Sequence, residues 1–238
     1  MTEQNPQILI QHYLSQNVGE MLPGLSHNLQ NFVHTLKMQL ELWEQRSRQA
    51  GDQMQAHTPK GLGRLQMTSQ ELGNFCQLME QRSKYTALDK SPVDLEGFCC
   101  WLRDFWKNNL FFKHQVQLEL YSDRISGLNL LLPPYALTMC LEEGLKNAIQ
   151  ACEQDNPEGD FQFKLQIEKN HQAVVLEFLA PSKLPPGLDP WERGSSNKKG
   201  HLGLGLFLVQ YLCRTLNWSS SLVNHQDQSL FRLQIPSS

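Results

Sequence analysis

The sequence is poor in charged residues, and its few charges nearly cancel. Only 19% of the 238 residues are charged, against about 25% in a typical soluble protein. The 21 Lys and Arg and the 24 Asp and Glu give a formal net charge of −3. A chain so near neutrality lacks the basic surface of a nucleic-acid-binding domain, so we expect no nucleic-acid partner. Glutamine is abundant where charged residues are few: the chain has 25 Gln, and 14 of them lie before residue 90.

Long hydrophobic runs and paired cysteines are missing as well. The longest apolar stretch, 128–141, is interrupted by Asn129, Pro133 and Pro134, and is shorter than the roughly 18 residues of a membrane-spanning helix. The first residues carry neither a basic region nor an apolar signal core. The six cysteines form no C-x-x-C pair, which argues against a zinc or redox site. We therefore expect a cytoplasmic protein without membrane insertion.

Two helical patterns occupy the first third of the chain. In the first, apolar residues recur at spacings of mostly three and four, as on one face of a bundle helix: Leu22, Leu25, Leu29, Phe32, Leu36 and Trp43. After a break with Gly and Pro between 50 and 63, a second pattern runs through Leu65, Leu72, Phe75 and Met79. A hairpin with a single apolar stripe buries little surface, so we expect two copies to pair as a homodimeric four-helix bundle.

After a linker at 89–92, the pattern changes to alternating helices and strands. We expect helices over 95–109, 134–153 and 203–216, and strands near 116–120, 161–167, 173–179, 221–223 and 230–235. This order favours an α/β sandwich with helices on one face. The predicted fold class is α+β, with a helical hairpin over 1–88 and the α/β sandwich over 89–238.

Two polar motifs in the second half could bind a phosphate or a cation. Gly200, Gly203 and Gly205 directly precede an apolar helix, where backbone N–H groups can approach a phosphate. Such glycines can equally begin a helix that holds no ligand. Glu143 and Asn147 are four residues apart on one helical face. They offer the oxygen ligands that Mg²⁺ prefers, but a solvated Glu–Asn pair has the same spacing.

His27 is the candidate nucleophile of the first half. It lies two residues from both Leu25 and Leu29, which at about 100° per residue places it on the exposed side of its helix. An exposed histidine is either an ordinary surface residue or an imidazole available for nucleophilic chemistry.

The order of these three features resembles the transmitter core of sensor histidine kinases. Gly24-Leu25-Ser26-His27 resembles the phosphoacceptor box of that family. The segment 132–149 resembles its N box, and 190–206 resembles its ATP lid and second glycine box. The resemblance extends over roughly residues 15 to 235.

The resemblance implies a dimerisation and histidine-phosphotransfer hairpin followed by an ATPase domain of the type shared with gyrases and heat-shock chaperones. It implies ATP and Mg²⁺ as cofactors and a response-regulator receiver domain as partner. Since no sensor domain is recognisable in the sequence, we expect the signal to come from a partner, such as a separate sensor protein, or from the regulator. It makes His27 the phosphoacceptor, with Asn31 retained in the same box. The implied nucleotide-site residues are Glu143, Asn147 (at the Mg²⁺ position), Lys199, Gly200, Gly203 and Gly205.

The sequence departs from the family pattern at two places. The family has an acidic residue directly after the phosphoacceptor, where this chain has Asn28, and an amide gives no general-base assistance. The first glycine box, D-x-G-x-G, is replaced by 179–183, with Leu179 where the aspartate should accept the adenine amino group. The lost acceptor costs about 1–3 kcal/mol or more.

Three interpretations follow. The chain is a phosphotransfer protein that uses His27 with a degenerate nucleotide domain, or an ATP-dependent histidine autokinase that tolerates the unusual glycine box. The third interpretation is a non-catalytic dimeric scaffold that binds receivers.

Overall fold

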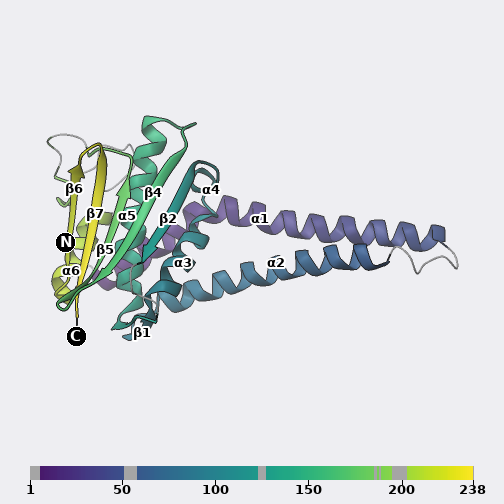
Figure 1. The fold of residues 1–238 in the computed structure, drawn as a ribbon, viewed down its shortest axis with the longest axis horizontal. Coiled ribbons are helices and arrows are strands. Elements are labelled where there is room, and N and C mark those ends of the chain that lie inside the picture. Colours follow the sequence, from purple (N-terminus) through teal and green to yellow (C-terminus); the bar gives the residue numbers. More distant parts are fainter. Residues whose placement is uncertain are drawn as a thin grey trace.

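A long helical arm projects from an α/β body in this computed structural model (Figure 1). The structure describes residues 6–50, 58–122, 127–184, 187, 189–194 and 203–237. The arm consists of α1 (Pro6–Ala50) and α2 (Thr58–Tyr85), and the body follows it in the chain. The prediction of a helical segment followed by an α/β domain is confirmed.

The two arm helices are longer than the sequence pattern indicates. Helix α1 begins at Pro6 and continues through Pro23. Helix α2 begins at Thr58 and includes Gly61 and Gly63, so the predicted break up to residue 63 is wrong at its end. Proline and glycine lower helix propensity, but packing against a neighbouring helix outweighs such local preferences.

Some residues of the apolar stripe of α1 pack within the chain, and others are exposed to solvent. Leu25 is buried, and Phe32 packs edge to face against Phe75 of α2, with ring centroids 5.9 Å apart. Other members of the predicted stripe point outward, among them Leu29 at 45% exposed and Trp43 at 49%. One chain therefore covers only part of the stripe.

The described part of the body contains eleven helices and strands. They are β1 (Ser91–Asp94), α3 (Leu95–Trp106), α4 (Leu110–Gln115), β2 (Val116–Ser122), β3 (Asn129–Leu132), α5 (Pro134–Asp155), β4 (Phe161–Lys169), β5 (Ala173–Ala180), α6 (Gly205–Leu216), β6 (Ser219–His225) and β7 (Gln228–Pro236). The predicted single helix over 95–109 is wrong at its end, because α3 stops at Trp106 and Asn109 caps a separate α4 through its side chain. The short strands β1 and β3 have no counterpart in the prediction.

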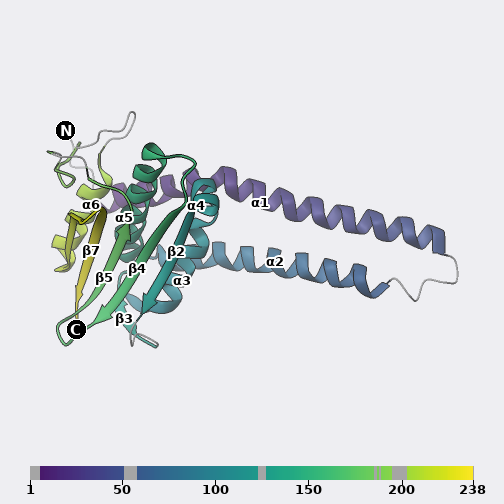
Figure 2. The ribbon, with the colours of Figure 1, turned by 45° about the horizontal axis from the view of Figure 1, so that its top comes forward.

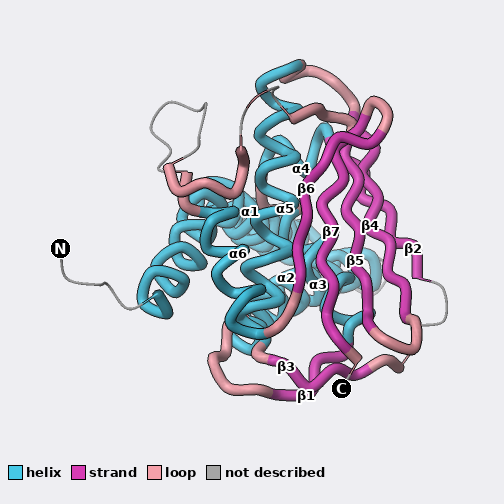
Figure 3. The backbone as a smooth tube through the Cα atoms, turned by 90° about the vertical axis from the view of Figure 1, so that its left-hand side faces the viewer, coloured by secondary structure: helices cyan, strands magenta, loops and turns pink. Residues whose placement is uncertain are grey.

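The main sheet has the strand order β2-β4-β5-β7-β6. Strands β2 and β4 are parallel, and the other neighbours are antiparallel. Helices cover one of its faces, as Figure 3 shows. Alternate residues of each strand face those helices, so Phe163, Phe178 and Phe231 form the buried side of three neighbouring strands. Within the described residues, no helix has the length and apolarity that a membrane span requires.

Helix α1 does not end where the body begins. Figures 1 and 2 show its N-terminal turns continuing past α5 towards α6. Ile10 and Leu14 are buried there in an apolar cluster with residues of both helices. The first turns of the chain are thus part of the body's core.

Candidate functional site

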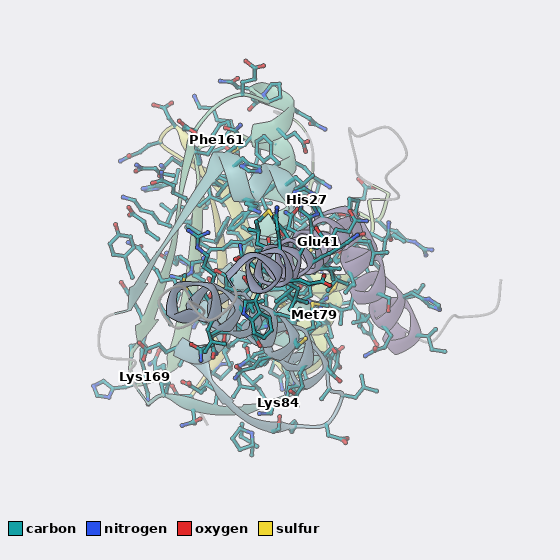
Figure 4. All side chains as sticks on the ribbon, turned by 90° about the vertical axis from the view of Figure 1, so that its right-hand side faces the viewer. His27, Glu41, Met79, Lys84, Phe161 and Lys169 are labelled. Carbon is teal, nitrogen blue, oxygen red and sulfur yellow. The ribbon has the colours of Figure 1, made fainter. Side chains whose placement is uncertain are left out.

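His27 is exposed on α1, as its helical position predicts. Figure 4 looks along the arm from its free end and labels His27. The side-chain amide nitrogen of Asn31, one helical turn further on, lies 3.1 Å from Nε2 of the imidazole. If that amide donates, Nε2 carries its lone pair and the proton is on Nδ1. The tautomer favoured by Asn31 is therefore the one whose Nε2 is nucleophilic.

The residue after His27 holds α1 against the body. Asn28 Nδ2 donates to Oδ1 of Asn108 at 2.9 Å, and Lys113 Nζ donates to Oδ1 of Asn28 at 3.3 Å. One turn earlier, α1 approaches the body so closely that a Cβ on Gly24 would collide with the carbonyl oxygen of Asn108. Asn28 therefore connects α1 to Asn108, between α3 and α4, and to Lys113 of α4, a role that its sequence context does not indicate.

The structure brings the glutamate of one predicted motif against the glycines of the other. Gly205 is the first residue of α6, and a Cβ there would collide with Oε2 of Glu143. Gly203 has a φ of 58°, a left-handed conformation that favours glycine. Asn147 donates from Nδ2 to the carbonyl oxygen of Glu143 at 2.8 Å. Lys199 and Gly200 lie outside the described residues.

Glu143 is buried at this junction, with 2% of its surface exposed. The hydroxyl of Tyr13, from α1, donates to Oε2 at 3.3 Å. Among the described residues, Oε1 has no hydrogen-bond partner. Burial raises the pKa of Glu143 to about 7, although the nearby Lys146 charge opposes the shift. Burial, followed by the charge of Glu143, likewise raises the pKa of Tyr13.

A second buried carboxylate lies beside the first and joins three helices. Arg82 of α2 forms a two-pronged ion pair with Glu142, which also accepts from Asn17 Nδ2 at 3.1 Å. Lys146 Nζ donates to Asn17 at 3.1 Å and to Glu20 at 2.7 Å. No local sequence pattern predicts this network, because its contacts join residues that are 60 to 129 positions apart.

The residues near the first glycine box do not fit adenine. Leu179 pairs with Lys164 of β4 and Leu230 of β7. It lies on the face of β5 opposite to Phe178 and Ala180, which are both buried under the helices. None of these side chains can accept a hydrogen bond from an adenine amino group. At the other motif, the Tyr13 hydroxyl contacts Oε2 of Glu143.

The comparisons with known proteins rest on structure alone. No protein-family model and no curated protein sequence matches the chain. The catalytic domain of histidine kinase ThkA superposes with a TM-score of 0.54 at 15% identity, covering 62% of this chain and 95% of that chain. ThkA in complex with the response regulator protein TrrA gives 0.50 at 14%, covering 97% and 67%. ShkA in complex with AMPPNP gives 0.51 at 14%, covering 74% and 38%.

These similarities define the class of fold. The chain has the fold of a histidine kinase transmitter, with a long helical segment followed by a kinase-type α/β domain.

Proposed function

We propose that this protein carries a phosphoryl group on His27 and exchanges it with the receiver domain of a response regulator. The observation that carries the proposal is the combination of an accessible His27, contacted by Asn31, with Leu179 in place of an adenine-accepting aspartate. The transmitter fold supports it, as does the solved complex of ThkA with a response regulator protein. The phosphoryl group would then come from a receiver rather than from ATP.

The chemistry requires only a nucleophilic imidazole. Nε2 of His27 attacks the phosphorus of an aspartyl phosphate, forming a P–N bond while the P–O bond to the aspartate breaks. The aspartate leaves as a carboxylate, and the imidazolium retains its proton on Nδ1. This route has little need for a general base beside His27, because the attacking nitrogen carries no proton in the tautomer that Asn31 favours. Asn28 in place of an acidic residue is therefore compatible with transfer.

We further propose that the outward face of α1 pairs with a second copy of the chain. Leu22, Leu29, Leu36 and Trp43 recur every seven residues, and Val33 and Leu40 lie between them. All but Leu36 are 45 to 57% exposed, and Leu36 is partly exposed. A heptad pattern is typical of helices that pair along a common seam. Val33, Leu36 and Leu40 of this face line a groove together with Lys37, Glu41 and Glu44.

The test is transfer of label from a phosphorylated receiver domain to the full-length protein. We expect His27→Ala to abolish labelling of the chain. His34→Ala is a matched control, because His34 is also exposed and lies seven residues further along the same side of α1. Equal labelling of both variants would refute the role of His27.

ATP-dependent autokinase activity is the second candidate. The contact between Glu143 and Gly205 favours it, because it brings together the two motifs that the resemblance assigns to the nucleotide site. The burial of Glu143 and the apolar Leu179 at the adenine-accepting position favour transfer between receivers instead. A receiver-binding scaffold would bind receivers without ever acquiring label.

A further inference from the structure

We propose that the first turns of α1 occupy the nucleotide site that the resemblance implies at the junction of α5 and α6, which we call the cleft, with Tyr13 inserted where phosphates would approach, so that this segment competes with nucleotide. The segment meant is 8–20, which lies entirely before His27. The inference goes beyond the proposed function, because transfer between a receiver and His27 does not pass through the cleft.

The cleft is identified by a buried carboxylate aimed at a helix start. Oε2 of Glu143 lies where a Cβ of Gly205 would be, at the first turn of α6. Its other oxygen, Oε1, has no hydrogen-bond partner among the described residues, although the side chain is almost fully buried. A buried carboxylate oxygen without a partner is costly. A ligand that brings a cation, such as Mg²⁺ with a nucleoside triphosphate, would satisfy it.

Tyr13 fills that place from α1. Its hydroxyl lies 3.3 Å from Oε2 of Glu143, and the same hydroxyl would lie within 2.7 Å of a Cβ on Gly205. The ring of Tyr13 lies 5.2 Å from Nζ of Lys146, within the range of a cation–π contact. One side chain therefore contacts the N-box glutamate, the neighbouring lysine and the start of α6 together.

Apolar burial holds the segment in the cleft. Ile10 is 1% exposed and Leu14 is 2% exposed. They pack in one cluster with Tyr135 and Met139 of α5 and with residues of α6, Leu208 and Leu212. On the neighbouring side of α1, Asn17 donates to Glu142 and accepts from Lys146. Both kinds of contact must break before the cleft can open.

Competition has a measurable consequence. If the cleft is open in only a small fraction of molecules, the apparent affinity for nucleotide is reduced by that fraction. Releasing the segment should then raise the affinity for a nucleotide analogue at least tenfold, even though adenine recognition is weakened.

The experiment compares Ile10→Asp with Ile8→Asp in the full-length protein. The two isoleucines are two residues apart on α1, but Ile8 is 55% exposed. Hydrogen exchange reports whether 8–20 is released, and a fluorescent ATP analogue with Mg²⁺ reports binding. We expect Ile10→Asp to accelerate exchange in 8–20 and to raise analogue affinity at least tenfold. Ile8→Asp should change neither.

Two results would overturn the proposal. One is release of 8–20 without a gain in analogue affinity. The other is exchange in 8–20 that is unchanged by Ile10→Asp, which would mean that Ile10 does not hold the segment in place. If exchange in β4 and β5 shows that Ile10→Asp unfolds the body, Tyr13→Ala replaces it. Tyr121→Ala is then its control, because Tyr121 pairs with Glu119 on the exposed side of β2. For Tyr13→Ala too, release of 8–20 without a gain in analogue affinity, or unchanged exchange in 8–20, would overturn the proposal. Neither measurement depends on phosphotransfer to His27.

Discussion

Removal of the Arg82 guanidinium should destabilise the protein more than loss of any surface ion pair. The Arg82 side chain is 7% exposed, and that of its partner Glu142 is fully buried. Arg82 also donates to the carbonyl oxygen of Leu14 at 3.1 Å, and its guanidinium lies 4.8 Å from the centre of the Phe105 ring. Burial lowers the pKa of Arg82 to about 10, so it stays charged at neutral pH.

The magnitude follows from the charge that remains. Arg82→Ala leaves the Glu142 carboxylate buried without its cation, and breaking a buried pair in this way costs about 3–5 kcal/mol. In a protein of this size each kcal/mol lowers the Tm by about 2–4 °C, so we expect a loss of roughly 6–20 °C. Thermal unfolding followed by circular dichroism measures it.

The control is an exposed pair of the same chemistry. Arg103 and Lys107 both contact Asp104, and all three side chains are at least one-third exposed. Arg103→Ala should cost about 0–1 kcal/mol. The double variant Arg82→Met, Glu142→Leu should recover much of the stability, because neither charge then remains buried. Equal losses for Arg82→Ala and Arg103→Ala would refute the reasoning.

Three further predictions concern the same helices. Burial raises the pKa of Glu143 from 4.5 to about 7, so the folded protein favours the protonated side chain. Protonated Glu143 therefore adds about 3 kcal/mol to the free energy of unfolding. This stability is fully present below pH 4.5 and is lost as the pH rises through 7. Glu143→Gln should flatten the stability change between pH 5 and 8 in denaturant titrations, and an unchanged slope would contradict the assignment. The double variant Val33→Asp, Leu40→Asp places two charges on the proposed dimer face and should convert the dimer to monomers. Sedimentation velocity measures the change, and a wild type that is already monomeric would contradict the prediction. Gly24→Ala should lower the free energy of unfolding by about 1–3 kcal/mol, because the new Cβ meets the backbone of Asn108. Gly73 has open space around it, so Gly73→Ala should raise the free energy of unfolding by about 0.5–1 kcal/mol. Similar Tm changes in the two variants would refute this.

Periodicity in the sequence was enough to predict the main elements. The spacing of Leu25 and Phe32 indicates the long first helix, and the alternation of Phe163, Leu165 and Ile167 indicates β4. These signals are local, since each depends on residues within one element. The short α4 and the strands β1 and β3 have too few residues to show a period.

The candidate site was less predictable, because its contacts are distant in the chain. Glu143 and Gly205 belong to recognisable motifs, but Tyr13 lies 130 residues before Glu143 and matches no motif. The apolar pattern of 1–88 predicts an arm apart from the body, and nothing in it indicates that 8–20 packs against α5 and α6. Leu179 shows a related limit: spacing alone does not determine on which face of β5 it lies.

The source of the phosphoryl group tests the central claim most directly. The full-length protein is incubated with Mg²⁺ and γ-labelled ATP in one arm, and with a labelled, phosphorylated receiver domain in the other. Our account predicts label on the wild-type chain from the receiver, no label from ATP, and loss of the receiver-derived label in His27→Ala. Label acquired from ATP on His27, or no label from any receiver, would contradict it.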